Sequence, residues 1–170
     1  MSMKCCVTGH RPEGFPFPRE ADDYQFCSYR EMLKDLILSL INEGFDYFIT
    51  GMAKGADLDL AKAVIDLRDN FTNIKLEAAL PYPIKSTQSP CDSTLEKRYC
   101  LKQCNIKTEV SGAYFRGCMQ KRNRYMVDNS DMVIAIWNGE KKGGTWNTIQ
   151  YAISKNKPVR YIMLNDIQTN

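Results

Sequence analysis

Two glycine-rich segments of this 170-residue sequence have the composition of turns that hold phosphate. Their candidate contact residues are Thr50, Gly51, Met52, Gly55 and Asp57 in the first segment and Gly143, Gly144 and Thr145 in the second. Glycine lets the backbone turn tightly and approach a ligand without a Cβ atom in the way, and the amides of a following helix favour an anion. One such turn is ordinary between a strand and a helix, but two in one small domain favour ligand binding.

The spacing of these glycines differs from that of the best-known nucleotide-binding motifs. Gly51 and Gly55 are separated by three residues, which fits neither GxGxxG nor GxxxxGK followed by Ser or Thr. A standard dinucleotide-dependent dehydrogenase and a P-loop NTPase are therefore disfavoured. Thr145 can cap the following helix or donate its hydroxyl to a phosphate. Asp57 is equally suited to capping a helix and to accepting hydrogen bonds from a ribose or base.

Two further groups of side chains lie where they can reach the same ligand. The first group, which follows the first apolar run of the chain, is Thr8, Gly9, His10 and Arg11. The second is a basic cluster without an acidic residue before Asp128, namely Arg116, Lys121, Arg122 and Arg124. Such a cluster is most often a solvated helix face, but it precedes an apolar run and can also reach a ligand crevice. We expect Arg122, Asn123 and Asp128 to lie nearest the ligand, since together they offer contacts to phosphate and to a sugar or base.

Charge is distributed unevenly along the chain. The whole sequence has 23 basic and 20 acidic residues, a formal net charge of +3. Residues 1–85 contain 10 basic and 13 acidic side chains, whereas residues 86–170 contain 13 basic and 7 acidic ones. A net charge of +3 is too small to indicate a nucleic-acid surface, so nucleic acid is not expected as a partner. The local excess in the second half instead suits a small anionic ligand.

The seven cysteines indicate thiols rather than disulfides or a metal site. Their number is odd, several lie inside apolar runs, and the N-terminal residues lack the apolar core of a signal peptide, so we expect a reduced, cytoplasmic protein. Cys91, Cys100, Cys104 and Cys118 could be drawn as four zinc ligands, but no close CxxC pair is present and His10 is the only histidine. Neither a metal nor a membrane segment is expected.

Apolar runs and helical periodicities alternate along the whole chain. Strands are predicted at 4–8, 47–50, Lys75–Leu80, 105–110, Met132–Trp137 and Val159–Met163, and helices around 33–41 and at 56–68, Leu95–Gln103, 119–127 and 145–154. Crossovers of this length require a largely parallel sheet, and the continuous apolar runs indicate strands buried on both faces. The prediction is a single α/β domain over residues 1–170, a doubly wound, mostly parallel, Rossmann-like sheet with helices on both faces. Ligands bind such sheets beyond the carboxyl ends of the strands.

Much of the chain resembles the YpsA-like branch of the SLOG superfamily, which is named for the Smf/DprA proteins and the LOG phosphoribohydrolases. The resemblance lies in CCVTGHRP from Cys5, ITGMAKGADLDLA from Ile49 and GCMQKRNRYMVDNSDMVIAIWNGEKKGGTWNTIQYA from Gly117. It implies a Rossmann-like fold with a pocket for a nucleotide or a nucleotide-derived, ADP-ribose-like molecule. LOG enzymes cleave the N-glycosidic bond of nucleoside monophosphates with the motif PGGxGTxxE, whose glutamate is essential. Thr148 stands in the place of that glutamate here, which argues against a LOG-type hydrolase.

The leading hypothesis is a cytosolic binding or sensor domain that requires no cofactor and holds a nucleotide or nucleotide-derived ligand, with phosphates on the two glycine-rich turns. An alternative is a hydrolase or transferase acting on the N-glycosidic bond of a nucleoside or nucleotide, with Asp57, Asp128 or Glu140 as its carboxylate. A third hypothesis is a protein-interaction module with a vestigial pocket. Tyr82 and Trp146 either stack on a base or pack structurally. Because related SLOG proteins often form dimers, the resemblance also suggests a homodimer.

Overall fold

The computed structural model describes residues 1–84 and 94–168, and in it strands and helices alternate as the sequence predicts. The strands are β1 (Met3–Gly9), β2 (Phe45–Thr50), β3 (Lys75–Leu80), β4 (Ile106–Glu109), β5 (Met132–Trp137) and β6 (Val159–Met163). The α-helices are α1 (Tyr24–Asn42), α2 (Ala56–Leu67), α3 (Leu95–Gln103), α4 (Cys118–Asp128) and α5 (Gly143–Ser154). Short 3-10 helices at Pro12–Gly14 and Leu164–Asp166 follow β1 and β6.

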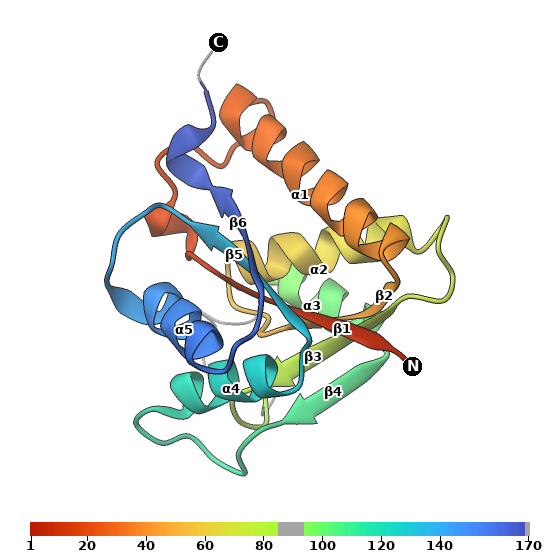
Figure 1. Ribbon diagram of the computed structural model, residues 1–170, viewed down its shortest axis with the longest axis vertical. Helices are drawn as coiled ribbons and strands as arrows, with labels where there is room; N and C mark the ends of the chain where they lie inside the picture. Colours follow the sequence, from red (N-terminus) through yellow and green to blue (C-terminus); the bar gives the residue numbers. More distant parts are fainter. Residues whose placement is uncertain (85–93, 169–170) are drawn as a thin grey trace.

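The six strands form one sheet in the order β4-β3-β2-β1-β5-β6 (Figure 1). All five pairings between these strands are parallel. β1 is central, and its Cys6 lies opposite Ile49 of β2 on one side and Val133 of β5 on the other. Cys5, Cys6 and Val7 are fully buried, as expected of a strand covered on both faces. The predicted α/β, Rossmann-like parallel sheet is confirmed.

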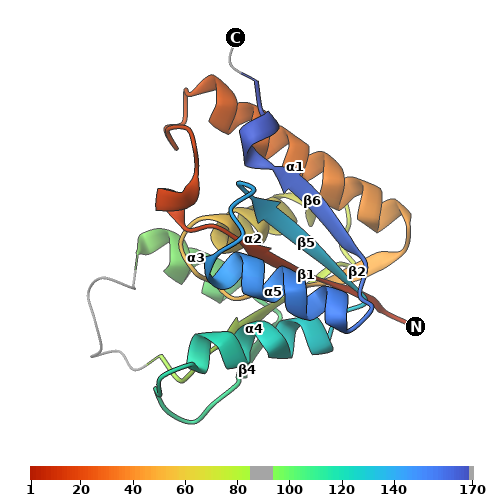
Figure 2. The ribbon, with the colours of Figure 1, turned by 60° about the vertical axis from the view of Figure 1, so that its left-hand side comes forward.

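Helices cover both faces of this sheet (Figures 1 and 2). On one face lie α1, α2 and α3, and Leu33, Ile37 and Leu40 of α1 point into a large apolar core because they recur at about one helical turn. On the other face α4 and α5 lie side by side over a smaller core that includes Met126 and Ala152. Burial of each such aliphatic side chain stabilises the fold by about 1.5–3 kcal/mol, so these two cores hold the helices in register with the strands.

The direction in which strands are added reverses between β1 and β5. From β1 the chain builds α1 and β2 on one side, whereas from β5 it continues through α5 to β6 on the other side. The connections that leave the carboxyl ends of β1 and β5 therefore diverge. Open α/β sheets bind ligands in the crevice that forms at such a point. The loop after β1 and the first turns of α2 and α5 border this crevice.

Two helix starts differ from the predicted ones. α1 begins at Tyr24, well before the clearest apolar periodicity, because the carboxylate of Asp23 accepts a hydrogen bond of 2.8 Å from the backbone N–H of Phe26 and caps the first turn. α5 begins at Gly143, so Thr145 lies inside its first turn and does not cap the helix. In the part of the chain that the structure describes, no helix combines the length and apolarity needed to cross a bilayer.

Candidate functional site

A cavity of about 340 Å³ lies in the crevice at the carboxyl ends of the central strands. Its lining residues are Val7, Thr8, Gly9, His10, Arg11 and Gly14 from β1 and the loop after it, Ala53 and Asp57 from the β2–α2 connection, Met119, Arg122 and Asn123 from α4, and Gly144 and Thr145 from α5. Parts of all the predicted contact groups thus converge here from distant points of the sequence. Concave sites of this kind, lined by a few convergent polar groups, are typical ligand sites.

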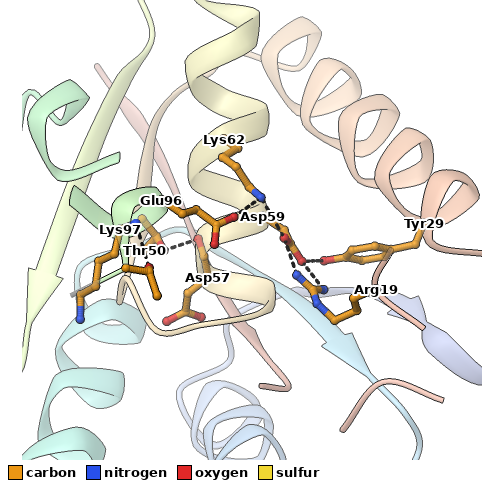
Figure 3. A network of polar contacts seen from close by, with 9 residues as sticks. Arg19, Tyr29, Thr50, Asp57, Asp59, Lys62, Glu96 and Lys97 are labelled. Atoms are coloured by element: carbon orange, nitrogen blue, oxygen red, sulfur yellow. Dashed lines mark hydrogen bonds and ion pairs between the residues drawn. The ribbon is translucent and has the colours of Figure 1, made fainter. Parts of the chain in front are cut away.

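One wall of the cavity contains a buried pair of opposite charges, Arg122 from α4 and Asp57 from the first turn of α2. Arg122 Nη1 lies 3.5 Å from Asp57 Oδ2 and donates a hydrogen bond of 2.5 Å to the carbonyl oxygen of Gly51. Asp57 Oδ2 also accepts a hydrogen bond of 3.2 Å from the backbone N–H of Ala53. The hydroxyl of Thr50 donates to the carbonyl oxygen of Asp57 at 2.8 Å (Figure 3). These contacts fix the β2–α2 connection against α4.

Removal from water acts on both charges of this pair. Burial raises the pKa of Asp57, and the guanidinium of Arg122 opposes that rise. Burial likewise lowers the pKa of Arg122, and the carboxylate of Asp57 opposes that fall. The cause is common, because surroundings of low polarity disfavour the charged form of either group. The Nε atom of Arg122 is buried and has no hydrogen-bond partner in the described residues, so one donor of the guanidinium is left to be satisfied.

The glycines of the first glycine-rich turn pack against the protein's own atoms. A Cβ atom at Gly51 would lie 1.6 Å from Nη1 of Arg122, and one at Gly55 would lie 2.5 Å from the carbonyl oxygen of His10. That oxygen already accepts a hydrogen bond of 3.1 Å from the backbone N–H of Ala56, at the start of α2. The residues of this turn that stand behind the cavity wall rather than lining it are Thr50, Gly51, Met52 and Gly55. Close packing therefore accounts for these glycines without a phosphate.

The second glycine-rich turn is open. A Cβ atom at Gly143 or Gly144 would meet no atom of the described residues within 4 Å. Gly143 has a φ of +79°, which lets the chain turn sharply into α5. The first amides of a helix have no acceptor within the helix, and the helix dipole is positive at this end. The exposed Lys141 and Lys142 directly precede the turn. The start of α5 is therefore better suited to an anion than the start of α2.

His10 and Arg11 lie along the cavity where the chain leaves β1. Arg11 is exposed and His10 is half-buried. Burial lowers the pKa of His10, against the opposing effect of a hydrogen bond with Asn138, so the ring is neutral at physiological pH. Its Nε2 atom is buried without a hydrogen-bond partner among residues 1–84 and 94–168. The segment after β1 therefore offers a ligand one charged and one uncharged polar group.

Two of the three predicted carboxylates lie away from the cavity. Asp128, at the last turn of α4, accepts hydrogen bonds of 3.0 and 3.1 Å from the hydroxyl of Tyr151. Glu140 is exposed in the β5–α5 connection and pairs with Lys142 at 3.1 Å. The structure does not bring either to the cavity: only the first half of α4 reaches the carboxyl edge of the sheet, and Glu140 lies on the exposed β5–α5 connection. Of the three, Asp57 alone lines the cavity.

Tyr82 and Trp146, the two side chains for which base stacking and structural packing were alternatives, pack against other aromatic rings. The ring of Tyr82 meets that of Tyr114 edge-on, with the centroids 5.6 Å apart. Trp146 stacks on Trp137 at a centroid distance of 5.3 Å and an interplanar angle of 15°. Neither Tyr82 nor Trp146 lines the cavity. These contacts agree with the structural role that was one of the two alternatives for these side chains.

Four lining residues, Val7, Gly14, Ala53 and Met119, were not singled out in the sequence. Met119 could have been, since it precedes Arg122 and Asn123 by about one helical turn and so shares their face of α4. Gly14 and Ala53 carry no polar side chain and give no such signal. Thr148, which stands in the place of the LOG glutamate, accepts a hydrogen bond of 3.1 Å from Nδ2 of Asn123 and donates one of 2.8 Å to the carbonyl oxygen of Gly144. It thereby ties α5 to α4.

Metal ligation finds no support in the described ranges 1–84 and 94–168. They contain no group of three or more His, Cys, Asp or Glu side chains that could hold a metal ion, and their six cysteines are free thiols. Cys91, one of the four cysteines considered as zinc ligands, lies outside these ranges. Burial raises the pKa of Cys6 to about 12 and that of Cys100 to about 11, so both are protonated and poorly reactive at neutral pH.

Known proteins that are similar to this chain share most of its length. A family model described as the YspA SLOG family matches residues 5–167. The chain is 30% identical over 140 residues to the uncharacterized SPbeta prophage-derived protein YoqJ of Bacillus subtilis (strain 168), covering 71% of this chain and 80% of that protein. It is 19% identical over 170 residues to the UPF0398 protein YpsA of the same strain, covering 95% and 93%. It is 24% identical over 149 residues to a UPF0398 protein of Ligilactobacillus salivarius (strain UCC118), covering 84% and 79%.

Proposed function

The chain belongs to the YspA SLOG family, and from that premise we propose that it binds a nucleotide or nucleotide-derived ligand in the cavity at the carboxyl ends of β1 and β5. Membership of a SLOG family suggests a nucleotide-related role, and the cavity supplies the groups that such a ligand needs. The first turn of α5 receives the phosphates, and Arg11 adds a positive charge. Asp57 accepts hydrogen bonds from ribose hydroxyls, as an acidic residue does in many nucleotide sites.

The observation that carries this proposal is the open first turn of α5 at the reversal of strand order. Gly144 lines the cavity, yet a Cβ atom there would meet no atom of the described residues within 4 Å. The glycine is thus not required by the packing of the protein, in contrast to Gly51. A phosphate at this turn accepts hydrogen bonds from free amides and lies at the positive end of the dipole. The volume of about 340 Å³ lies at the small end of the range for ligand sites, which starts at about 300 Å³.

A second candidate function, hydrolysis or transfer at an N-glycosidic bond, is favoured by one feature of Asp57. Its carboxyl lines the cavity, is buried and has a raised pKa, which is the property of a general acid. Asp57 would have to supply the carboxylate of such an enzyme, because Thr148, at the position of the LOG glutamate, has none and is hydrogen-bonded between α4 and α5. Chromatography of each bound nucleotide after incubation separates the two functions. Release of free base that disappears in Asp57→Asn would favour the enzyme over the binding protein.

The binding function is tested by thermal denaturation in the presence of AMP, ADP and ADP-ribose at millimolar concentration. A ligand present at about 100 times its Kd stabilises the folded protein by about 2.7 kcal/mol. For a chain of this size the melting temperature then rises by roughly 5–10 °C. An unchanged melting temperature with all three nucleotides would contradict the proposed function.

The variant Gly144→Asp tests whether the phosphates of the ligand bind at the first turn of α5. A carboxylate in the first turn of α5 interacts favourably with the helix dipole, so the unliganded protein remains folded, but it repels a phosphate at the same turn. We expect the rise in melting temperature with ADP to disappear in this variant. Gly112→Asp is the matched control, because Gly112 lies in an exposed loop outside the cavity and a Cβ atom there also meets no atom within 4 Å in the described structure. Equal loss of the ADP response in both variants would show that the phosphates lie elsewhere.

A further inference from the structure

The buried pair of Arg122 and Asp57 has hydrogen-bonding capacity that the described protein atoms do not use. Both side chains line the cavity, and they are only 7% and 9% exposed. Nη1 of the guanidinium is bound to the carbonyl oxygen of Gly51 and to Asp57, whereas Nε is buried and has no acceptor in the described residues. A buried donor without an acceptor destabilises a fold, so its presence in a cavity wall points to a ligand that supplies the acceptor.

The carboxylate of Asp57 has spare capacity of the opposite kind. Its Oδ2 atom accepts the hydrogen bonds from Ala53 and Arg122, and no residue within 1–84 and 94–168 donates to Oδ1. The carboxyl group points away from Asp59 and its partners (Figure 3). The pair therefore offers a ligand one free acceptor and one free donor, on two side chains that are already in contact.

A hydroxyl group is the ligand group that uses both positions, because it donates to the carboxylate and accepts from the guanidinium. A phosphate oxygen only accepts, and it would lie against the negative charge of Asp57. An ammonium group only donates, and it would lie against the positive charge of Arg122. Of the parts of a nucleotide, this leaves the ribose hydroxyls and the edge of the base, which also carries donors and acceptors.

The lining of the cavity gives a base little to stack on. Proteins commonly hold bases by stacking them on aromatic rings. Among the described lining residues the one ring is the imidazole of His10, and it is packed against Gly14, where a Cβ atom would lie 2.7 Å from Cγ of His10. Residues 85–93 and 169–170, outside the described ranges, contain no Phe, Tyr or Trp. The ribose is therefore the better match to this cavity.

The size of the cavity leads to the same choice. Its volume of about 340 Å³ is near the lower limit of about 300 Å³ for ligand sites. In a nucleotide the ribose is bonded to the phosphate, and the base is bonded only to the ribose. A ligand whose phosphate binds at the first turn of α5 thus places its ribose in the cavity and its base at or beyond the opening.

We propose that the cavity recognises the 5-phosphorylated ribose of its ligand rather than the base, and that Asp57 Oδ1 and Arg122 Nε hold one ribose hydroxyl. This inference rests on the proposed function and deepens it: ribonucleotides bind whatever their base, and deoxyribonucleotides that lack this hydroxyl bind poorly. Arg122 is thereby a specificity-determining residue. The juxtaposition that carries the inference is a free donor and a free acceptor within one buried ion pair of the cavity wall.

Isothermal titration with AMP, GMP, CMP and ribose 5-phosphate tests whether the base is recognised. We expect the Kd values of these probes to agree within about fivefold, because the groups that distinguish them lie outside the cavity. Titration with 2′-deoxy-AMP and 3′-deoxy-AMP tests the hydroxyl. The analogue that lacks the hydroxyl held by the pair should bind about 10- to 100-fold more weakly than AMP, since it leaves two buried polar groups unpaired.

Arg122→Lys removes Nε and keeps a positive charge opposite Asp57, because a lysine side chain has a methylene group in place of Nε. This variant should bind AMP no more tightly than the deoxy analogue, while its Kd for that analogue stays within about threefold of the value for the unmodified protein. Asp57→Asn, which keeps the size of the side chain, removes the charge of the acceptor and should reduce the same ratio of Kd values. A purely structural role of Arg122 would weaken AMP and the analogue equally, which would contradict the inference.

Arg19→Lys is the matched control, because Arg19 pairs with Asp59, in the same turn of α2 as Asp57, but does not line the cavity. The ratio of the Kd values for AMP and the deoxy analogue should be unchanged in this control. Equal binding of AMP and both deoxy analogues by the unmodified protein would overturn the inference and leave the proposed function standing. Binding of AMP without binding of GMP, CMP and ribose 5-phosphate would do the same. Absence of binding by every probe would overturn the proposed function and the inference together.

Discussion

At the scale of single residues, glycine occupies three positions at the carboxyl edge of the sheet for different physical reasons. At Gly51 the space of a side chain is taken by the guanidinium of Arg122, and at Gly55 it is taken by the backbone of His10. At Gly144 the same space is open and belongs to the cavity. Replacing a glycine whose side-chain space is filled by protein atoms should lower the stability of the fold. Replacing a glycine that leaves open space beside the start of a helix should instead affect ligand binding.

Two alanine substitutions separate these roles. Gly51→Ala forces the Arg122 guanidinium away from a contact of 1.6 Å, and overpacking of a buried site costs about 1–3 kcal/mol of unfolding free energy. Gly144→Ala adds a methyl group to open space in a helix, so it should stabilise the unliganded protein by up to about 1 kcal/mol. Urea denaturation of both variants measures the difference. Destabilisation by Gly144→Ala equal to that by Gly51→Ala would mean that the first turn of α5 is packed after all.

The sequence predicts two glycine-rich turns before helices, but it does not predict which atoms fill the space beside each glycine. The pattern of Gly51 and Gly55 before a helix is the same whether a phosphate or an arginine lies against it. Arg122 is 71 residues away in the chain from the carbonyl oxygen it binds, so no local pattern reports the contact. For the same reason Asp128 was expected at the ligand, although the rise of α4 carries it away from the cavity.

At the scale of elements, the first turn of α2 holds two carboxylates that point to different parts of the molecule (Figure 3). Asp57 lines the cavity, whereas Asp59 binds the guanidinium of Arg19 with two hydrogen bonds of 2.8 and 2.9 Å. The hydroxyl of Tyr29 donates to Asp59 at 3.0 Å. The same guanidinium lies 4.4 Å from the centroid of the Phe15 ring. Asp59 therefore anchors the loop after β1, the loop that begins with the cavity residues.

Arg19→Gln should release that loop. Loss of the two hydrogen bonds from Arg19 leaves the buried carboxylate of Asp59 with the hydroxyl of Tyr29 and the ammonium of Lys62 at 3.7 Å, and we expect a loss of about 1–3 kcal/mol in unfolding free energy. Hydrogen exchange at residues 10–23 should become faster before global unfolding. Binding of ADP should weaken, because His10 and Arg11 lose their fixed position.

Arg160→Gln is the matched control for this loop. Arg160 forms the same two-bond geometry with Glu43, at 2.8 and 2.6 Å, but both side chains are substantially exposed. Exposed pairs contribute about 0–1 kcal/mol, so this variant should lose little stability and leave exchange at residues 10–23 unchanged. Loss of stability in Arg19→Gln no larger than in the control would show that the loop is held by its aromatic side chains instead.

At the scale of the whole molecule, the alternation of strands and helices was predictable because each element is a local pattern. The apolar residues of Met132–Trp137 are sufficient to predict a strand. The length of the connections between successive strands then requires the strands to pair in parallel. The place of β5 was not predictable, because its pairing with β1 joins residues more than 120 positions apart. That pairing creates the crevice, so the position of the site depends on a contact that no local pattern contains.

The same topology places part of the basic excess of the second half of the sequence on α4 and at the start of α5. The basic α3 lies on one face together with α1 and α2 of the more acidic first half, and α4 and α5 of the basic second half lie on the other (Figure 1). Lys121 and Arg124 are on α4 of the second face, and Lys141 and Lys142 directly precede the first turn of α5, where the phosphates are proposed to bind. A net charge of only +3 thus coexists with a local positive field at the site.

This arrangement makes ligand affinity depend on ionic strength through a few lysines rather than through net charge. Between about 10 and 200 mM salt the screening length falls from about 30 Å to under 10 Å, so the Kd for ADP should rise several-fold. The double variant Lys141→Gln, Lys142→Gln should lose most of the dependence of Kd on salt, because the two charges that it removes flank the first turn of α5. The double variant Lys34→Gln, Lys102→Gln removes the same net charge from α1 and α3 and should keep it. Titration calorimetry across the salt series would contradict this local field if both double variants flattened the dependence equally.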